Sequence, residues 1–229
     1  MTAMLELPTI ARALEDESPE RILAWAAEHL PRLTFATGFG AEGCVIIDLI
    51  AREGLKIDLF TLDTGVLFPE TYALWRQLET RYGVTIRAVR AEAATPERWR
   101  TNPDACCEQR KVRPLREALA GFDAWITAIR RDQTPERASA QVVEHDKKFD
   151  LVKVNPLVTW THDQVWAHIY KHDVPYNPLH ERGYPSIGCA PCTSPIIPGE
   201  SLRAGRWRGA AKKECGLHTS APLQAKEKP

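Results

Sequence analysis

The chain has 229 residues, which suits one domain or two small ones, because domains commonly hold ~100–200 residues. Its 30 Lys and Arg side chains balance 30 Asp and Glu side chains, which argues against a broad electrostatic coat for nucleic acid or membranes. The 44% apolar content excludes global disorder, and no apolar run approaches the ~20 residues that cross a bilayer. Residues 1–20 lack the basic and apolar regions of a signal peptide, so we expect a cytoplasmic protein.

The first predicted element is a helix that begins after Ser18 and ends at Pro31. Ser18 is a good N-cap, and Pro19 occupies a position where its missing N–H costs nothing. Strands and helices then alternate along the chain. We predict strands over residues 33–37, 57–62, 84–89, 124–129 and 151–154. We predict helices over residues 44–53, 69–82, 107–120 and 162–172, the last with a capping box formed by Thr161 and Gln164.

The alternation of strands and helices predicts the fold class. Short apolar runs such as residues 57–62 cannot be distinguished from buried helix by periodicity, so no single segment decides. Alternation implies parallel βαβ units and hence a doubly wound, mainly parallel α/β sheet. Prolines and glycines dominate from about residue 173 to residue 229, which predicts an irregular C-terminal extension with a frayed KEKP end. We expect residues 1–229 to form one domain.

Two turns follow the first two predicted strands. Residues 37–43 read TGFGAEG, where glycines let the backbone approach a ligand and the following helix N-terminus attracts anions. Asp63-Thr64-Gly65 follows the second strand at the same edge of the sheet, where α/β proteins bind ligands. Each turn has a purely structural alternative, a glycine turn or an Asx turn. Together they predict a phosphate-binding edge.

Four cysteines are the strongest chemical signal in the chain. Cys106 and Cys107 are adjacent, and Cys189 and Cys192 form a CxxC pair. Two close pairs of thiolates suit a zinc ion or an iron–sulfur cluster. Adjacent side chains on a helix diverge by ~100°, so the first pair reaches two metal atoms of a polynuclear cluster more easily than one zinc ion. This favours [4Fe–4S], with zinc, a redox CxxC and buried thiols as the alternatives.

A further cysteine, Cys215, lies in a basic segment. Five basic and two acidic side chains accompany it between residues 199 and 218: Arg203, Arg206, Arg208, Lys212, Lys213, Glu200 and Glu214. Positive surroundings lower the pKa of a thiol, so we predict a reactive thiolate that Gly216 leaves accessible. The alternative is an ordinary surface cysteine. Cys44 lies in an apolar helix, and we interpret it as a small buried hydrophobe.

Taken together, these motifs resemble those of a known family. They are TGFGAEG, LDTG with PETY, CCEQRK, IRRDQTPER, GCAPCT, RAGRW and ECGLH. With them the chain resembles the thioredoxin-dependent adenylyl-sulfate (APS) reductases of bacterial sulfate assimilation, which are relatives of the PAPS reductases. The resemblance runs from about residue 33 to residue 218.

The resemblance implies an N-type ATP-pyrophosphatase-like α/β fold, with one [4Fe–4S] cluster on Cys106, Cys107, Cys189 and Cys192. It also implies that the Cys215 thiolate attacks the sulfur of APS, so that AMP leaves and an S-sulfocysteine remains. Thioredoxin or a similar dithiol protein then releases sulfite. Family members without the cluster cysteines look like PAPS reductases, so the four cysteines point to APS as the substrate.

The resemblance further implies a set of groups that bind the dianionic phosphosulfate. The candidate substrate-binding residues are Gly38, Phe39, Gly40, Asp63, Lys111, Arg137, Arg203, Arg206 and His218. Lys111 lies four residues after Cys107, so on a helix both side chains project to one face. We hypothesise that Lys111 bridges the charges of cluster and substrate.

Three other functions stay open. A PAPS reductase would need an extra phosphate pocket and no cluster. An ATP-pyrophosphatase that modifies an RNA or a small molecule would carry an SGGxDS-like turn, whereas residues 37–43 lack its serine and its aspartate. A zinc-stabilised interaction module would be colourless. We expect no nucleic-acid or membrane partner, and the sequence allows a homo-oligomer.

Overall fold

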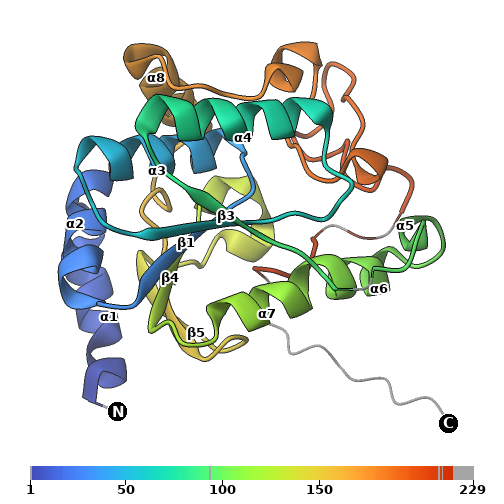
Figure 1. Ribbon diagram of the computed structural model, residues 1–229. Coiled ribbons are helices and arrows are strands. Elements are labelled where there is room, and N and C mark those ends of the chain that lie inside the picture. The colour runs from blue at the N-terminus through green and yellow to red at the C-terminus, as the bar shows by residue number, and fades with distance from the viewer. Residues whose placement is uncertain (1, 93, 211, 213, 219–229) are drawn as a thin grey trace, which may run out of the picture.

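The computed structural model describes residues 2–92, 94–210, 212 and 214–218, with the backbone alone for residues 2–5 (Figure 1). Within these residues the chain forms a six-stranded sheet in the order β3-β2-β1-β4-β6-β5. The strands are β1 Leu33–Thr37, β2 Asp58–Leu62, β3 Ile86–Val89, β4 Ala124–Ile126, β5 Val143–Asp146 and β6 Leu151–Val154. Every neighbouring pair is parallel except β5 with β6. The predicted doubly wound, mainly parallel α/β sheet is confirmed.

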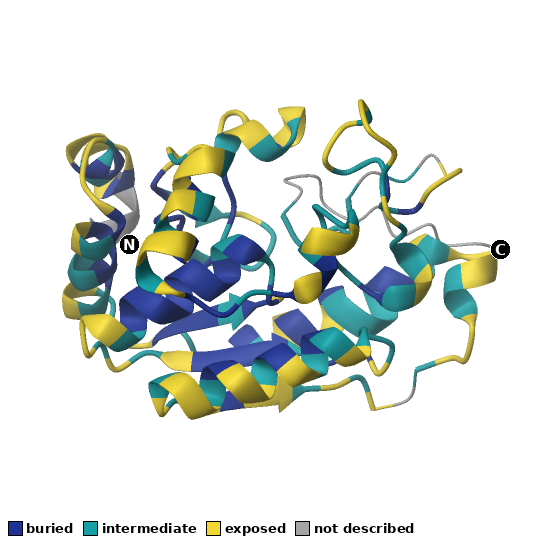
Figure 2. Ribbon diagram, turned by 90° about the horizontal axis from the view of Figure 1, so that it is seen from above, coloured by how far each residue is buried: buried dark blue, intermediate teal, exposed yellow. Residues whose placement is uncertain are grey.

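Helices cover both faces of this sheet. They are α1 Thr2–Leu14, α2 Pro19–His29, α3 Ala41–Arg52, α4 Pro69–Tyr82, α5 Arg98–Thr101, α6 Pro103–Cys107, α7 Arg113–Leu119 and α8 His162–His172. Figure 1 shows α3, α4 and α8 above the sheet and α7 below it. The sheet and the helix faces turned toward it are buried, while the outward helix faces are exposed (Figure 2). This two-sided cover leaves the carboxyl edge of the parallel strands for a ligand.

Local capping signals set several helix ends as predicted. The Ser18 hydroxyl accepts a hydrogen bond from the Arg21 N–H at the start of α2. Thr161 and Gln164 form both hydrogen bonds of a capping box at the start of α8. Helix α4 has the predicted bounds and ends at Gly83, whose φ of 63° is left-handed.

The sequence did not predict α1 or β5. Pro8 lies inside α1, and proline normally interrupts a helix. The buried side chains Leu7 and Leu14 pack α1 onto the main core, which offsets that cost. Strand β5 reads VEHD, and only Val143 in it is buried, so it lacks the apolar pattern of an internal strand.

The helix expected over residues 107–120 begins earlier and changes type within its length. The Asn102 side chain accepts a hydrogen bond from the Ala105 N–H and caps α6, so the helix starts at Pro103. Residues Glu108–Val112 then form a π-helix, η1, before α7 continues to Leu119. A π-helical stretch inserts one residue per turn and alters which side chains share a face. Strand β4 likewise ends at Ile126 rather than at residue 129.

The C-terminal extension is irregular over its described residues, as predicted. It contains the short 3₁₀ helices η4 Pro178–Arg182 and η5 Ala190–Cys192. Isolated bridges join Leu67 to Cys189 and Thr193 to Arg206, so the extension is tied to the loop after β2. The KEKP end, predicted to fray, lies outside the described residues.

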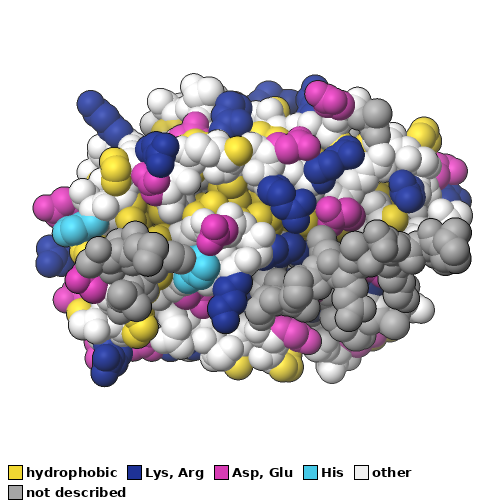
Figure 3. All heavy atoms as spheres, turned by 90° about the horizontal axis from the view of Figure 1, so that it is seen from below, with side chains coloured by type: hydrophobic (Ala, Val, Ile, Leu, Met, Phe, Trp, Pro, Cys, Tyr) yellow, Lys and Arg dark blue, Asp and Glu magenta, His cyan; other side chains and the backbone are white. Residues whose placement is uncertain are grey.

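The surface carries charges of both signs. In Figure 3, Lys and Arg side chains in dark blue are interspersed with Asp and Glu side chains in magenta over one face. This distribution agrees with the zero formal net charge. Among the described helices, none is both long and apolar enough to span a bilayer.

Candidate active site

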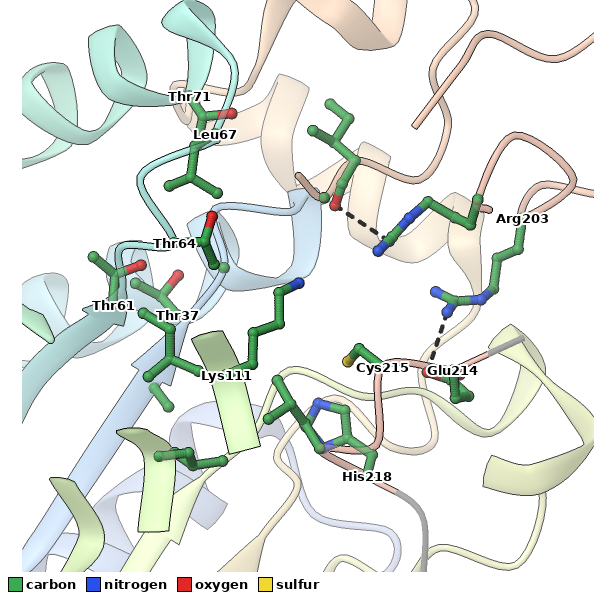
Figure 4. A pocket seen from close by; sticks show the side chains of 18 of the residues that line it. Thr37, Thr61, Thr64, Leu67, Thr71, Lys111, Arg203, Glu214, Cys215 and His218 are labelled. Carbon is green, nitrogen blue, oxygen red and sulfur yellow. Dashed lines mark hydrogen bonds and ion pairs between the residues drawn. The ribbon is translucent and has the colours of Figure 1, made fainter. Parts of the chain in front are cut away.

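A cavity of about 200 Å³, partly open to solvent, lies at the carboxyl ends of β1 and β2 (Figure 4). Strands β1 and β2 and the turns that follow them contribute Thr37, Gly38, Thr61 and Thr64 to its wall, and η1 contributes Lys111. The C-terminal extension closes the opposite side with Arg203, Arg206, Glu214, Cys215, Leu217 and His218. Figure 4 shows the Lys111 ammonium pointing into the space between the threonines and Cys215. Segments far apart in sequence therefore meet at the edge where the turns were expected.

The turn after β1 is shaped by Phe39. Its φ of 57° is left-handed, its side chain is buried, and its ring stacks on Trp75 at 5.5 Å between centroids. The Phe39 N–H donates to the Thr37 hydroxyl at 3.1 Å. Gly38 lines the cavity, whereas Gly40 lies in an adjoining recess as the N-cap of α3. The Phe39 side chain thus packs into the core and leaves the turn backbone beside the cavity.

Asp63 holds the turn after β2. Its buried carboxylate accepts hydrogen bonds from the Tyr72 hydroxyl at 2.6 Å, the Gly65 N–H at 3.0 Å and Arg90 Nε at 2.8 Å. Burial would raise the pKa of Asp63, but these donors outweigh it and lower that pKa. The structure does not bring this carboxylate to the cavity; the neighbouring Thr64 lines it instead.

The four cysteines line one small recess next to this cavity. Cys106 and Cys107 come from α6, and Cys189 and Cys192 come from either end of the CxxC segment. The Thr64 hydroxyl lies 3.3 Å from the Cys189 sulfur. Burial raises the pKa of Cys106 and Cys192, and it raises the pKa of Cys107 to about 12.

This recess brings two distant sequence pairs together. In the part of the chain that the structure describes, no group of three or more His, Cys, Asp or Glu side chains is arranged to hold a single metal ion. The donors available at the recess are four thiols, with Lys111 and Arg206 beside them.

Lys111 lies between the two cysteine sites and lines both cavities. Burial disfavours its charge, but the nearby thiols of Cys189 and Cys215 outweigh that effect and raise the pKa of Lys111. An ammonium with a raised pKa stays charged at neutral pH. Lys111 is therefore a fixed positive charge shared by both sites.

Cys215 is the thiol whose pKa is shifted toward reactivity. Burial would raise it, but the Lys111 charge, the Leu217 N–H and Arg206 together lower the pKa of Cys215. The residue is half-buried and lines the cavity. Cys44, by contrast, is fully buried in α3, and burial raises its pKa, as expected of an inert thiol.

The remaining polar groups of the cavity are arginines and a histidine. Arg137 and Arg203 both form ion pairs with Glu214, at 3.0 Å and 3.2 Å. His218 stacks on Trp125, with ring centroids 5.7 Å apart and planes at 8°. Burial and the surrounding cations lower the pKa of His218 well below its usual value, so its ring is neutral.

Comparison with known proteins identifies the family. A model of the phosphoadenosine phosphosulfate reductase domain matches residues 32–195. The chain belongs to this family. The adenosine 5'-phosphosulfate reductase of Anoxybacillus flavithermus, a relative, is 42% identical to it, over 93% of this chain and 95% of the relative.

Relatives in the family carry two substrate names. The protein of Gloeobacter violaceus named phosphoadenosine 5'-phosphosulfate reductase is 45% identical, over 93% of each chain. The crystal structure of the phosphoadenylyl-sulfate (PAPS) reductase from Candida auris, a phosphate complex, superposes with a TM-score of 0.75 at 31% identity. It covers 83% of this chain and 96% of that one. This agreement confirms the fold expected from the family motifs.

Several residues of the site were not found from the sequence. In the structure Trp125 stacks on His218, whereas in the sequence it is one apolar residue among those of β4. Thr61 lines the cavity because it lies near the carboxyl end of the parallel strand β2, a position that could have indicated it; Thr64 lies in the turn after β2, where the sequence indicated Asp63. Glu214 was counted only as one acidic residue in a basic segment, yet it pairs with two arginines of the site.

Proposed function

We propose that this protein reduces adenylyl sulfate to sulfite and AMP, with Cys215 as the nucleophile and a dithiol protein of the thioredoxin class as the reductant. One observation carries this proposal. A thiol with a lowered pKa and a permanently charged lysine face one cavity at the carboxyl edge of the sheet, and arginines line the same cavity. A nucleophilic thiolate beside cations suits attack on an anionic sulfonyl group.

In the first step the Cys215 thiolate attacks the sulfur of the sulfate group. An S–S bond forms between the thiol sulfur and the sulfonyl sulfur, and the S–O bond to the phosphate breaks. AMP leaves with the bridging oxygen and its electron pair, and Cys215 becomes an S-sulfocysteine. The positive charges of Lys111 and Arg206, both of which line the cavity, would stabilise the developing negative charge.

In the second step a thiolate of the reductant attacks the Cys215 sulfur. Sulfite leaves with the electron pair of the S–S bond, and a mixed disulfide links the two proteins. The second thiol of the reductant then attacks its own partner sulfur, which restores the Cys215 thiolate and leaves a disulfide in the reductant. The two electrons that convert the sulfonyl group to sulfite thus come from the dithiol.

The substrate anion would bind to guanidinium groups that already converge on the cavity. Arg137 and Arg203 offer planar donors that suit phosphate and sulfate. The buried Nδ1 of His218 has no hydrogen-bond partner among the described residues, so a neutral imidazole atom is free to contact the nucleotide. Gly38, which has no side chain, would let the backbone approach the nucleotide closely.

The four-cysteine recess fits an iron–sulfur cluster. Its donor set is Cys106, Cys107, Cys189 and Cys192, and thiolate ligands are those that [4Fe–4S] clusters take. Deprotonating the three thiols with raised pKa values, those of Cys106, Cys107 and Cys192, requires metal cations. When bound, the cluster would join α6 to the CxxC segment through metal–sulfur bonds. Transfer to Cys215 requires no electron from it.

A PAPS reductase is the second candidate, because one relative at 45% identity carries that name. The deciding experiment measures sulfite release by anaerobically purified protein, with thioredoxin, from adenylyl sulfate and from its 3'-phosphorylated analogue. We expect kcat/KM to be larger for adenylyl sulfate, and the reverse order would favour PAPS reduction. Without reductant, mass spectrometry should find one sulfonate group on Cys215. Its absence from that residue would refute the mechanism.

A further inference from the structure

Glu214, the residue before the proposed nucleophile, is a buried anion at the centre of the site. Only 7% of its side chain is exposed. Its carboxylate lies 3.0 Å from Arg137 and 3.2 Å from Arg203, and Figure 4 shows the second contact at the cavity wall. By contrast, the other acidic side chain of the basic segment, Glu200, pairs with Arg208 outside the cavity.

The Glu214 contacts have the form of a bound substrate anion. A carboxylate between two guanidinium groups uses the same N–H donors that bind a phosphate or a sulfate. Arg137 and Arg203 line the cavity, so a carboxylate on their donors competes with any external anion there. The buried Nε atoms of Arg137 and Arg206 have no hydrogen-bond partner within the described residues, which leaves donors at this point of the cavity unsatisfied.

We propose that Glu214 is an internal competitor of the substrate anion: its carboxylate occupies the Arg137–Arg203 pair in the free enzyme, and substrate binding displaces it. The identity of that anion rests on the proposed function, whereas the contact and its effect on Cys215 do not. Because Glu214 precedes Cys215 directly, breaking its ion pairs also loosens the backbone next to the thiol.

Displacement follows from the cost of an unpaired buried charge. While Glu214 pairs with both arginines, its charge is balanced, although its Oε1 has no hydrogen-bond partner among the described residues. Once a substrate anion takes those donors, the carboxylate would be buried beside another anion, so it must move toward solvent. Other contacts hold the segment on both sides of Cys215: Lys212 pairs with Asp104, Lys148 Nζ donates to the Gly216 carbonyl, and His218 stacks on Trp125. Release at Glu214 therefore loosens the backbone beside Cys215 between these anchors.

The first test is the rate at which iodoacetamide alkylates Cys215, measured against pH in wild type, Glu214→Gln and Glu200→Gln. The midpoint of the pH profile reports the thiolate fraction, and the plateau at high pH reports access to the thiol. Glu214→Gln should raise the plateau roughly 5-fold, because it raises the fraction of molecules with a released segment. Glu200→Gln should leave the plateau unchanged, since Glu200 lies outside the cavity.

The second test is AMP binding, measured by titration calorimetry on the same variants. Glu214→Gln should bind AMP more tightly, by roughly the factor that raises the alkylation plateau, because both report the same released fraction. If Glu214 instead serves only to orient Arg137 and Arg203, the variant binds AMP more weakly, and the proposal is overturned.

The outcomes separate this inference from the proposed function. An unchanged alkylation plateau in Glu214→Gln overturns the inference whatever the substrate is. Wild-type protein that neither binds AMP nor consumes adenylyl sulfate refutes the proposed function but leaves the alkylation test intact. Should Glu214→Gln fail to fold, Glu214→Asp replaces it: the shorter side chain keeps its charge, and the plateau should rise by a smaller factor.

Discussion

Two groups of cysteines lie on either side of Lys111, and they differ in pKa. In the recess, burial raises the pKa of Cys106, Cys107 and Cys192 although Lys111 is close. On the other side of Lys111, burial also disfavours the Cys215 thiolate. There the Lys111 charge, the Leu217 N–H and Arg206 outweigh burial and lower the pKa of Cys215. The same cation thus stands beside thiols of opposite character.

Burial is the largest influence at both sites, and the other charges and hydrogen bonds around each thiol make the difference. In the recess each thiolate would be repelled by its neighbours, and the Cys189 charge raises the pKa of both Cys106 and Cys107. Cys215 lies outside the four-cysteine recess, and the Leu217 N–H and Arg206 add to the effect of Lys111 there. One ammonium can stabilise one thiolate, whereas four adjacent thiolates need metal cations. One site is therefore suited to nucleophilic attack and the other to a cluster.

The largest effect should come from removing the single thiol. We expect Cys215→Ser to lower sulfite release at least ~10³-fold. A hydroxyl cannot replace the thiolate as nucleophile, and a serine adduct would have no S–S bond for the dithiol to cleave. Circular dichroism and iron content should match those of the wild type. Retained turnover would contradict the role of Cys215 and would remove the contrast between the two sites.

Loss of one cysteine of the four-cysteine recess should remove the iron that the recess holds. We expect wild-type protein purified without oxygen to hold about four iron atoms per chain and a brown colour. Cys189→Ser should lose most of that iron and the visible absorbance. Cys44→Ala serves as the matched control and should keep both, because Cys44 lines neither recess nor cavity. One zinc ion and no colour in the wild type would contradict the cluster assignment.

Removing the Lys111 charge should raise the pKa of the Cys215 thiol. Since the pKa of Cys215 is lowered, its alkylation should reach half-maximum below the ~8.5 of an ordinary thiol. Lys111→Ala should shift that midpoint to higher pH and reduce kcat/KM by roughly 10- to 100-fold.

Lys147→Ala is the control for this prediction. Lys147 is exposed and lies outside the substrate cavity, so its loss should change the midpoint and kcat/KM little. Equal effects of the two substitutions would show that Lys111 has no special position between the cysteine sites.

The smallest effect is expected from a substitution far from both cysteine sites, in the capping box of α8. Thr161→Ala removes one side-chain hydrogen bond from the capping box of α8. The free energy of unfolding should fall by about 1 kcal/mol in urea denaturation. Iron content and the alkylation midpoint of Cys215 should stay at wild-type values. A change in either would mean that general destabilisation, rather than Lys111, explains effects on the cysteines.

Most of the sheet could be predicted from local pattern. Apolar strands such as β1, and caps such as Ser18 and Thr161, depend on neighbouring residues alone. Helix α1 and strand β5 could not, because their sequences contain a proline and mostly polar residues. Packing between these distant elements supplies what their own propensities do not.

The sequence by itself determined the alternation of strands and helices, the family and the residue types of both cysteine sites, because spacing and motif are local properties. Tertiary structure decided where the side chains point. It turned Phe39 into the core, used Asp63 to hold a turn, and set Lys111 between two groups of thiols. It also placed Glu214 on the arginine pair. Electrostatic effects depend on distances between segments remote in sequence, and only folding sets those distances.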